Sequence, residues 1–422
     1  MSMVQRLTGL HWRQQGPIML VGMGHGATHW LLGTFYILMP FIARQLGLSY
    51  TETGLLVSTI HMSSFATNLF SGLAVDVTGR RVPILVASLG IGALALASFG
   101  QANGVFGLLP LVILIGCTNN MWPPAAISYI SRRFPDQRGY ALSIHALGAN
   151  SGDALAPLAV GAALVWLSWS QAAMAAAVPT LVVAFVLFAA LPRQTSAQRQ
   201  ADADGAKGGP KVGTKEGEGM SMAAYWRGLR ALLRDRAVLS LCLVAALRTM
   251  TQAGLLAFLP LYLANDLGAG PVMLGLALAA MQSAGVVAAP IAGAWSDRVG
   301  RRPIVLAGLS ASTVVIAGLV TLGHMATFIA GIAVLGFVLF AVRPVIHSWM
   351  MDLTPANLGG SATSLMFGSQ AILATAAPII GGLIADRWGL GAVFYFLAGG
   401  LLAANLALVF LPLGKRAETV SG

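Results

Sequence analysis

The sequence predicts an all-helical, polytopic membrane protein in which twelve transmembrane helices form two similar six-helix halves. Three observations predict this fold: long apolar runs without charge, a one-sided distribution of Lys and Arg, and an internal repeat. Of 422 residues, 57% are apolar and 9% are charged, whereas charged residues make up about a quarter of an ordinary soluble domain. The composition excludes a soluble globular fold.

Four long runs contain no Asp, Glu, Lys or Arg: residues 82–131, 154–192, 303–342 and 353–385. A helix that crosses a bilayer needs about 20 predominantly apolar residues, so each run has room for one or two. A membrane β-barrel would show alternation over segments of about ten residues, but these runs are continuously apolar. The expected helices are 17–44, 50–75, 83–101, 106–130, 138–165, 168–191, 238–263, 271–296, 303–323, 326–350, 358–385 and 391–412.

The basic residues sort to one side of the membrane when these helices are threaded through it. Of the 25 Lys and Arg residues, Arg44 and Arg387 would lie outside, Arg248 and Arg343 lie within helices, and the other 21 would face the cytoplasm. Cytoplasmic loops are enriched in Lys and Arg. The sequence therefore predicts a multi-pass protein of the bacterial cytoplasmic (inner) membrane with both termini cytoplasmic. The same sorting explains the net charge of +11 without a nucleic-acid partner.

A polar segment separates the two halves. We expect an N-terminal six-helix bundle over 1–191, a cytoplasmic linker over 192–237 and a C-terminal six-helix bundle over 238–422. Within the linker, 194–219 has too little apolar surface to fold and is expected to be a tether. An amphipathic helix on the inner leaflet is expected after it. Its apolar face is Tyr225, Trp226, Leu229, Leu232 and Leu233, opposite Arg227, Arg230 and Arg234.

The halves repeat each other at an offset near 221 residues, which indicates two six-helix repeats. Pro40 matches Pro260, and the dipeptide Ala156-Pro157 matches Ala377-Pro378. The sharpest match is a loop motif that occurs twice. Its residues are Gly72, Asp76, Gly79, Arg80 and Arg81 in the first copy, and Gly293, Asp297, Gly300, Arg301 and Arg302 in the second.

On these motifs the chain resembles the major facilitator superfamily across essentially its whole length. The family's signature, G-x-L-x-D-x-x-G-R-R, lies between helices 2 and 3, and here the first copy has Ala74 where Leu is usual. The resemblance implies a transporter, not an enzyme, in which the ten motif residues latch one conformational state. It also implies that helices 1, 4, 7 and 10 line a central cavity. The Asp can accept hydrogen bonds from a helix N-terminus, and the arginines can face lipid phosphates.

Few ionisable side chains lie within the expected helices, where they are costly and usually functional. With neutral histidines, two arginines and one carboxylate leave a net charge of +1, which favours an anionic solute. Arg248 lies about 15 Å into its helix, near the midplane. The candidate solute contacts are His25, His29, Asn119, Asn120, Trp122, Arg248, Gln252, Arg343 and His347.

Asp153 is the only acid expected deep within the bilayer, and we expect it to carry the coupling proton, together with His145 and His61. A buried carboxylate has a raised pKa and can exchange a proton. Each of these groups also has an alternative role. Asp153 could be the charge partner of an arginine, and His61 and His145 could be packing residues. Arg343 could cap the backbone carbonyls that Pro344 leaves without a donor. His25 and His29 share a helix face and suit a proton relay, an anion contact or, less well, a metal site.

Within the family, the chain resembles the fosmidomycin-resistance-like exporters of the drug efflux subgroup. The similarity rests on 25–40 followed by 46–50, on 134–139 leading to 148–153, and on 355–367. It implies export of a small phosphonate-like or related drug in exchange for protons. Thr118 stands where the family's drug antiporters carry an Arg, which weakens a multidrug interpretation.

Together these observations predict a proton-coupled exporter of a small organic anion that acts as a monomer among membrane lipids. The alternative is an uptake symporter or exchanger of a carboxylate metabolite, which would use the same arginines. A transporter-like sensor would be expected to carry a signalling segment, and the only extra segment is the linker. No G-x-x-x-x-G-K-[ST] loop occurs, so ATP hydrolysis is not expected, nor is a cofactor or a structural metal.

Overall fold

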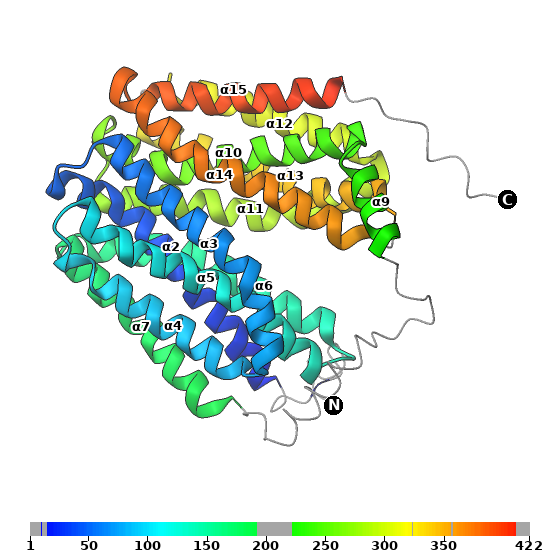
Figure 1. The fold of residues 1–422 in the computed structure, drawn as a ribbon. Helices are drawn as coiled ribbons and strands as arrows, with labels where there is room; N and C mark the ends of the chain where they lie inside the picture. Colours follow the sequence, from blue (N-terminus) through cyan, green and yellow to red (C-terminus); the bar gives the residue numbers. More distant parts are fainter. Residues whose placement is uncertain (1–9, 11–14, 192–221, 323, 356–357, 411–422) are drawn as a thin grey trace. The chain divides into compact units, whose positions relative to one another are not determined.

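The computed structural model describes residues 10, 15–191, 222–322, 324–355 and 358–410. These residues form thirteen α-helices and one 3-10 turn, with no strand in the described ranges (Figure 1). The long helices of the first half are α2 (Gly16–Leu46), α3 (Tyr50–Thr78), α4 (Arg81–Ala97), α5 (Val105–Arg133), α6 (Arg138–Ala163) and α7 (Trp169–Ala190). Those of the second half are α10 (Arg236–Asn265), α11 (Pro271–Val299), α12 (Arg301–Leu319), α13 (Met325–Leu353), α14 (Gly359–Trp388) and α15 (Leu390–Val409).

These twelve helices confirm the predicted all-helical membrane fold. Ten of them are long and apolar enough to cross a bilayer. The other two, α3 and α6, have comparable length but contain more polar side chains, including His61 on α3 and Asn150 and Asp153 on α6. Large apolar side chains such as Phe70 and Phe185 are 66% and 70% exposed on the helix surfaces, which suits lipid rather than water as the surrounding solvent.

Local sequence signals set the helix ends. Ser49 begins α3 with a capping box, because its hydroxyl accepts from the N–H of Glu52 and the Glu52 carboxylate accepts from the N–H of Ser49. In the two loop motifs, Gly79 ends α3 with φ of 62° and Gly300 precedes α12 with φ of 98°. Only glycine adopts such angles without strain, which explains why Gly79 and Gly300 occupy these positions in the two motifs.

The expected amphipathic helix is present as α9 (Met222–Leu232), and Trp226 on it is 59% exposed while Leu232 is buried. The expected tether lies outside the described residues. So do nine of the basic residues assigned to the cytoplasm: Arg6, Arg13, Arg193, Arg199, Lys207, Lys211, Lys215, Lys415 and Arg416.

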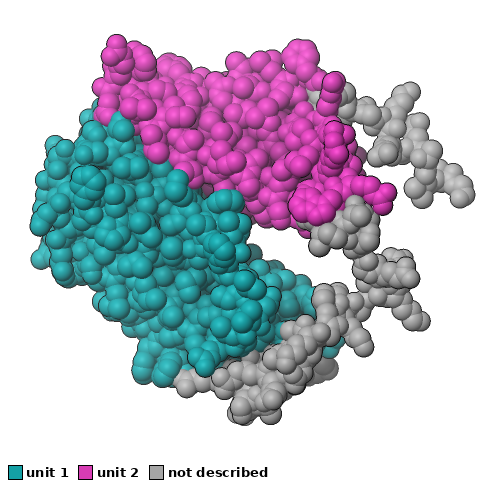
Figure 2. All heavy atoms as spheres, viewed as in Figure 1, with its two compact units in different colours: residues 1–214, 257–283 teal, residues 215–256, 284–422 magenta. Residues whose placement is uncertain are grey.

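The chain divides into two compact units, one of residues 1–214 with 257–283 and the other of residues 215–256 with 284–422 (Figure 2). The first unit contains the whole of α2 to α7, and the second contains the whole of α12 to α15. The bundle boundaries expected from the sequence stay a prediction.

Candidate functional site

A glycine seam joins α2 and α6 within the first unit. Gly22 and Gly26 on α2, and Gly148 and Gly152 on α6, have the spacing that puts small residues on one helix face. A Cβ added at Gly148 would meet the carbonyl oxygen of Gly22, and one added at Gly152 would meet that of Gly26. The two backbones therefore touch, and side chains beside the glycines are brought within contact distance across the seam.

Beside this seam lie four ionisable side chains, His25, His29, His145 and Asp153, which we name the His–Asp cluster. His29 Nδ1 lies 2.9 Å from Asp153 Oδ2. His25 Nδ1 donates to the carbonyl oxygen of His145 at 2.8 Å, and the two rings stack with centroids 3.8 Å apart. The rings of His25 and His29 meet edge to face at 4.9 Å. The structure thus brings together two predicted solute contacts and two predicted proton carriers.

The cluster has an accessible end and a buried end. The side chains of His29 and Asp153 are 26% and 24% exposed, whereas His145 is 5% exposed and its Nε2 atom has no hydrogen-bond partner. A neutral imidazole that donates from Nδ1 keeps Nε2 as an acceptor, so His25 can accept a proton at that atom. The His29–Asp153 pair can take up a proton at its exposed end, and the stacked rings of His25 and His145 lie next to it. The partner of the Asp153 carboxylate here is a histidine, which differs from the arginine considered for it above.

Histidine pairs also suit metal ions, but in the described part of the chain no group of three or more His, Cys, Asp or Glu side chains could hold one. The third predicted proton carrier, His61, lies on α3 and is not part of the cluster, and its Nε2 atom is buried without a hydrogen-bond partner.

On α5 the structure leaves two predicted solute contacts with unused polar atoms. Asn119 Oδ1 and Trp122 Nε1 are buried and have no hydrogen-bond partner, and the Trp122 ring lies against the backbone of Gly24 on α2. Asn120 is next to them and partly exposed. Buried polar atoms without partners are uncommon in proteins and are candidates for contact with a ligand or water.

Arg248 lies in the second unit and is 2% exposed. Its Nε and Nη2 atoms each donate to the carbonyl oxygen of Leu339 at 3.1 Å, and its Nη1 atom donates to Gln252 Oε1 at 2.6 Å. The guanidinium also lies 5.5 Å from the ring centroid of Phe340. These partners are neutral, so they solvate the cation without balancing its charge.

Arg343 and His347 lie one turn apart on α13, and both interact electrostatically with Arg248. The ring of His347 meets Phe367 edge to face at 5.3 Å. Two guanidinium groups within interaction range of each other concentrate positive charge in this unit. Gln370 on α14 was not among the residues predicted from the sequence; its Oε1 atom accepts from Thr249 at 3.0 Å, and its Nε2 atom is buried without a partner. The signal in the sequence that could have identified Gln370 was an amide side chain within a long run that contains no charged residue.

The two loop motifs differ in their contacts. In the first copy Arg81 is buried and donates to Ser128 at 2.7 Å, while Asp76 is exposed. In the second copy Arg301 pairs with Asp297 and, at 3.1 Å, with Asp352 of α13.

Two further contacts complete the second copy. Arg301 donates to Ser296 at 2.7 Å, and Arg302 donates to the carbonyl oxygen of Val409 at 2.8 Å. The second motif therefore ties α11, α12, α13 and α15 together. Motif spacing alone did not identify Asp352 as a partner.

Comparison with known proteins places relatives of this chain among membrane transporters. A sequence model of the Major Facilitator Superfamily matches residues 19–262 and 241–421. The chain is 25% identical to the multidrug resistance protein MdtG of Klebsiella pneumoniae (strain 342), over 94% of this chain and 92% of that protein. It is 26% identical to the hexuronate transporter of Bacillus subtilis (strain 168), over 91% and 92%.

A third relative is the fosmidomycin resistance protein of Escherichia coli (strain K12), which is 22% identical over 94% of this chain and 93% of that protein. Among solved structures, a bacterial homologue of the human lysosomal transporter Spinster superposes with a TM-score of 0.74 at 14% identity. That match covers 95% of this chain and 96% of the other, and it shows agreement in fold.

Proposed function

This chain belongs to the Major Facilitator Superfamily, and from that premise we propose that it exports a small organic anion across the bacterial cytoplasmic membrane in exchange for protons. It is a multi-pass membrane transporter that carries a small solute and is not an enzyme. The anionic solute, the proton coupling and the outward direction are the proposal, which the following observations support.

The single observation that supports the proton coupling is the His29–Asp153 pair at 2.9 Å, which joins α2 and α6. Ionisable groups inside a bilayer are rare and mark ion pathways and proton relays. Histidine changes its charge near neutral pH, so it can bind and release a proton under physiological conditions. His25 and His145 extend the pair into a group of four, so we include all of these residues in the proton pathway.

The anionic solute is supported by the surroundings of Arg248. A buried charge that has only neutral partners is destabilising unless a counter-ion arrives. The three hydrogen bonds of Arg248 leave two of its five N–H donors for another acceptor. A guanidinium can hold a carboxylate or phosphonate through two parallel hydrogen bonds. Arg343 and His347 are proposed to add to this anion site, with Gln252 orienting the guanidinium.

The outward direction is supported by two relatives whose names describe resistance: the multidrug resistance protein and the fosmidomycin resistance protein. A second candidate is uptake by symport, since the hexuronate transporter is equally similar and a hexuronate carries a carboxylate. Symport would couple binding of the solute to binding of a proton, whereas exchange requires that solute and proton displace each other.

Purified protein in liposomes distinguishes these cases, with candidate carboxylates and phosphonates offered under an imposed pH gradient. If the protein exchanges solute for protons, an acidic interior drives accumulation; if it is a symporter, an acidic exterior does. If neither gradient drives accumulation of the solute, proton coupling is contradicted. If the protein transports only organic cations, the anion site is contradicted. Empty liposomes with the same gradient correct for passive entry of the protonated acids.

A further inference from the structure

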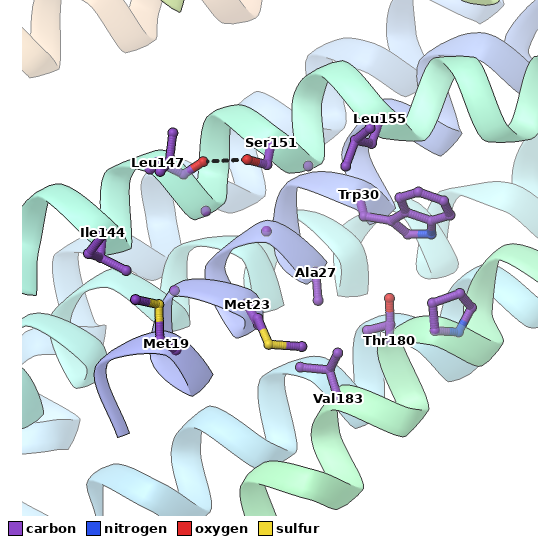
Figure 3. A pocket seen from close by; sticks show the side chains of 15 residues that line it. Met19, Met23, Ala27, Trp30, Ile144, Leu147, Ser151, Leu155, Thr180 and Val183 are labelled. Atoms are coloured by element: carbon purple, nitrogen blue, oxygen red, sulfur yellow. Dashed lines mark hydrogen bonds between the residues drawn. The ribbon is translucent and has the colours of Figure 1, made fainter. Parts of the chain in front are cut away.

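An apolar groove of about 480 Å³ lies where α2, α6 and α7 meet, within the first unit (Figure 3). Its floor is the glycine seam, and its walls include Met23 and Trp30 on α2 and Val183 on α7. It is separate from the His–Asp cluster. Successive helix residues turn by roughly 100°, so the histidines of α2 lie on one flank of the glycine ridge while Met23 and Trp30 lie on the other.

Large apolar side chains at the rim of this groove are exposed. Met23, Leu147 and Leu155 are 55%, 52% and 56% exposed. In a membrane-spanning bundle such positions face either the lipid or another apolar molecule. An apolar rim of this kind suits the entry of compounds dissolved in the bilayer.

One polar atom in the groove wall has no partner. Thr180 is 0% exposed, and its hydroxyl oxygen makes no hydrogen bond. Figure 3 shows this oxygen directed into the groove, toward the space between Ala27 and Trp30. A threonine in a helix usually donates to the carbonyl four residues earlier, which here is Ala176. That carbonyl instead accepts from Trp30 Nε1 at 2.8 Å.

The other polar groups of the groove are already bonded. The Ser151 hydroxyl donates to the carbonyl oxygen of Leu147 at 2.9 Å (Figure 3), and Trp30 Nε1 is engaged as described. None of the side chains that line the groove is charged. A buried hydroxyl without a partner is destabilising, so the groove offers a ligand one hydrogen bond and an apolar surface.

We propose that this groove binds an uncharged lipophilic molecule that carries one hydrogen-bonding group and enters from the bilayer. Its volume is within the range of pockets that hold drug-sized ligands. The apolar walls take the body of the ligand, and the Thr180 hydroxyl takes its polar atom. A plain acyl chain fits the walls but leaves the hydroxyl unpaired, so the groove favours an alcohol, ketone or ether over a hydrocarbon. This ligand differs from the anionic solute, and the proposal does not depend on that solute.

Photolabelling tests this assignment with two probes of equal chain length, a diazirine-bearing long-chain alcohol and the corresponding hydrocarbon. The full-length protein in phosphatidylcholine vesicles is irradiated with each, and the labelled peptides are mapped. The alcohol should label peptides of α2, α6 and α7 saturably and in competition with unlabelled alcohol. Thr180→Val should lower this labelling about two- to tenfold, as expected for loss of one hydrogen bond, and leave hydrocarbon labelling unchanged.

Two variants control the experiment. Thr313→Val removes a hydroxyl that is already bonded within α12 and should change nothing, whereas Val183→Trp fills the groove and should abolish labelling by both probes. Equal labelling of the groove by alcohol and hydrocarbon, insensitive to Thr180→Val, would show a lipid chain as the occupant and overturn the proposal. Labelling spread evenly over the lipid-facing helices would overturn it as well.

Discussion

At the scale of single residues, the central feature is a carboxylate held against an imidazole inside the membrane. Replacing Asp153 with Asn keeps the shape but removes the charge that pairs with His29. We expect Asp153→Asn to abolish accumulation driven by a pH gradient while solute exchange at equal pH continues, because the solute contacts remain. The measurement is flux in proteoliposomes with and without the gradient. Accumulation equal to that of the unaltered protein would exclude Asp153 from coupling.

Thr180 gives a second prediction at this scale. Its buried hydroxyl has no partner, so Thr180→Val should stabilise the ligand-free protein by on the order of 1–3 kcal/mol. The melting temperature of delipidated protein in detergent should rise. Ser151→Ala, which removes a bonded hydroxyl, should give no such rise. A lower melting temperature for Thr180→Val would mean that the hydroxyl has a partner in the folded protein.

The sequence identified most candidate residues but not their partners. His25, His29, His145 and Asp153 were found because ionisable groups stand out in apolar helices. The pairing of His29 with Asp153 and of His25 with His145 depends on which helices touch, and residue spacing within one helix does not contain that information. The structure places His29 against Asp153 and His25 against His145; contact of these α2 histidines with the solute stays a prediction. Thr180 carries no charge, so nothing in its sequence context distinguished it from a packing residue.

At the scale of helices, the glycine seam between α2 and α6 positions the His–Asp cluster. A Cβ on Gly148 would meet the backbone of Gly22, which cannot move without separating the helices. Gly148→Ala should therefore destabilise the protein by about 1–3 kcal/mol, as overpacking does, and reduce proton-driven transport. Thermal unfolding and proteoliposome flux measure the two effects.

Gly90→Ala on α4 is the matched control, because a Cβ there meets nothing within 4 Å. It should raise stability by about 0.5–1 kcal/mol, since alanine loses less backbone entropy than glycine in a helix. Equal effects of the two substitutions on stability and transport would show that the glycine seam does not position the cluster. The Gly-x-x-x-Gly spacing is visible in each helix separately, but the sequence does not show that these two segments, more than 100 residues apart, pack against each other.

At the scale of the whole molecule, the twelve helices and the family followed from apolar length and from the repeated loop motif. Lipid imposes these features directly, because every backbone group in the bilayer must bond within its own helix. The solute and the direction of transport could not be predicted from the sequence, because they depend on a few side chains that approach one another only after folding. Arg248 illustrates the difference: its depth was predictable, but its bonds to Leu339 and Gln252 were not.

The most direct test of the account is gradient-driven flux of a radiolabelled organic anion in proteoliposomes that carry Arg248→Gln, beside Arg387→Gln as a charge-matched control. Arg387 lies in the last turn of α14, with its guanidinium over the ring of Trp388. We expect Arg248→Gln to fold but to lose transport, and Arg387→Gln to transport normally. Full transport by Arg248→Gln would contradict it.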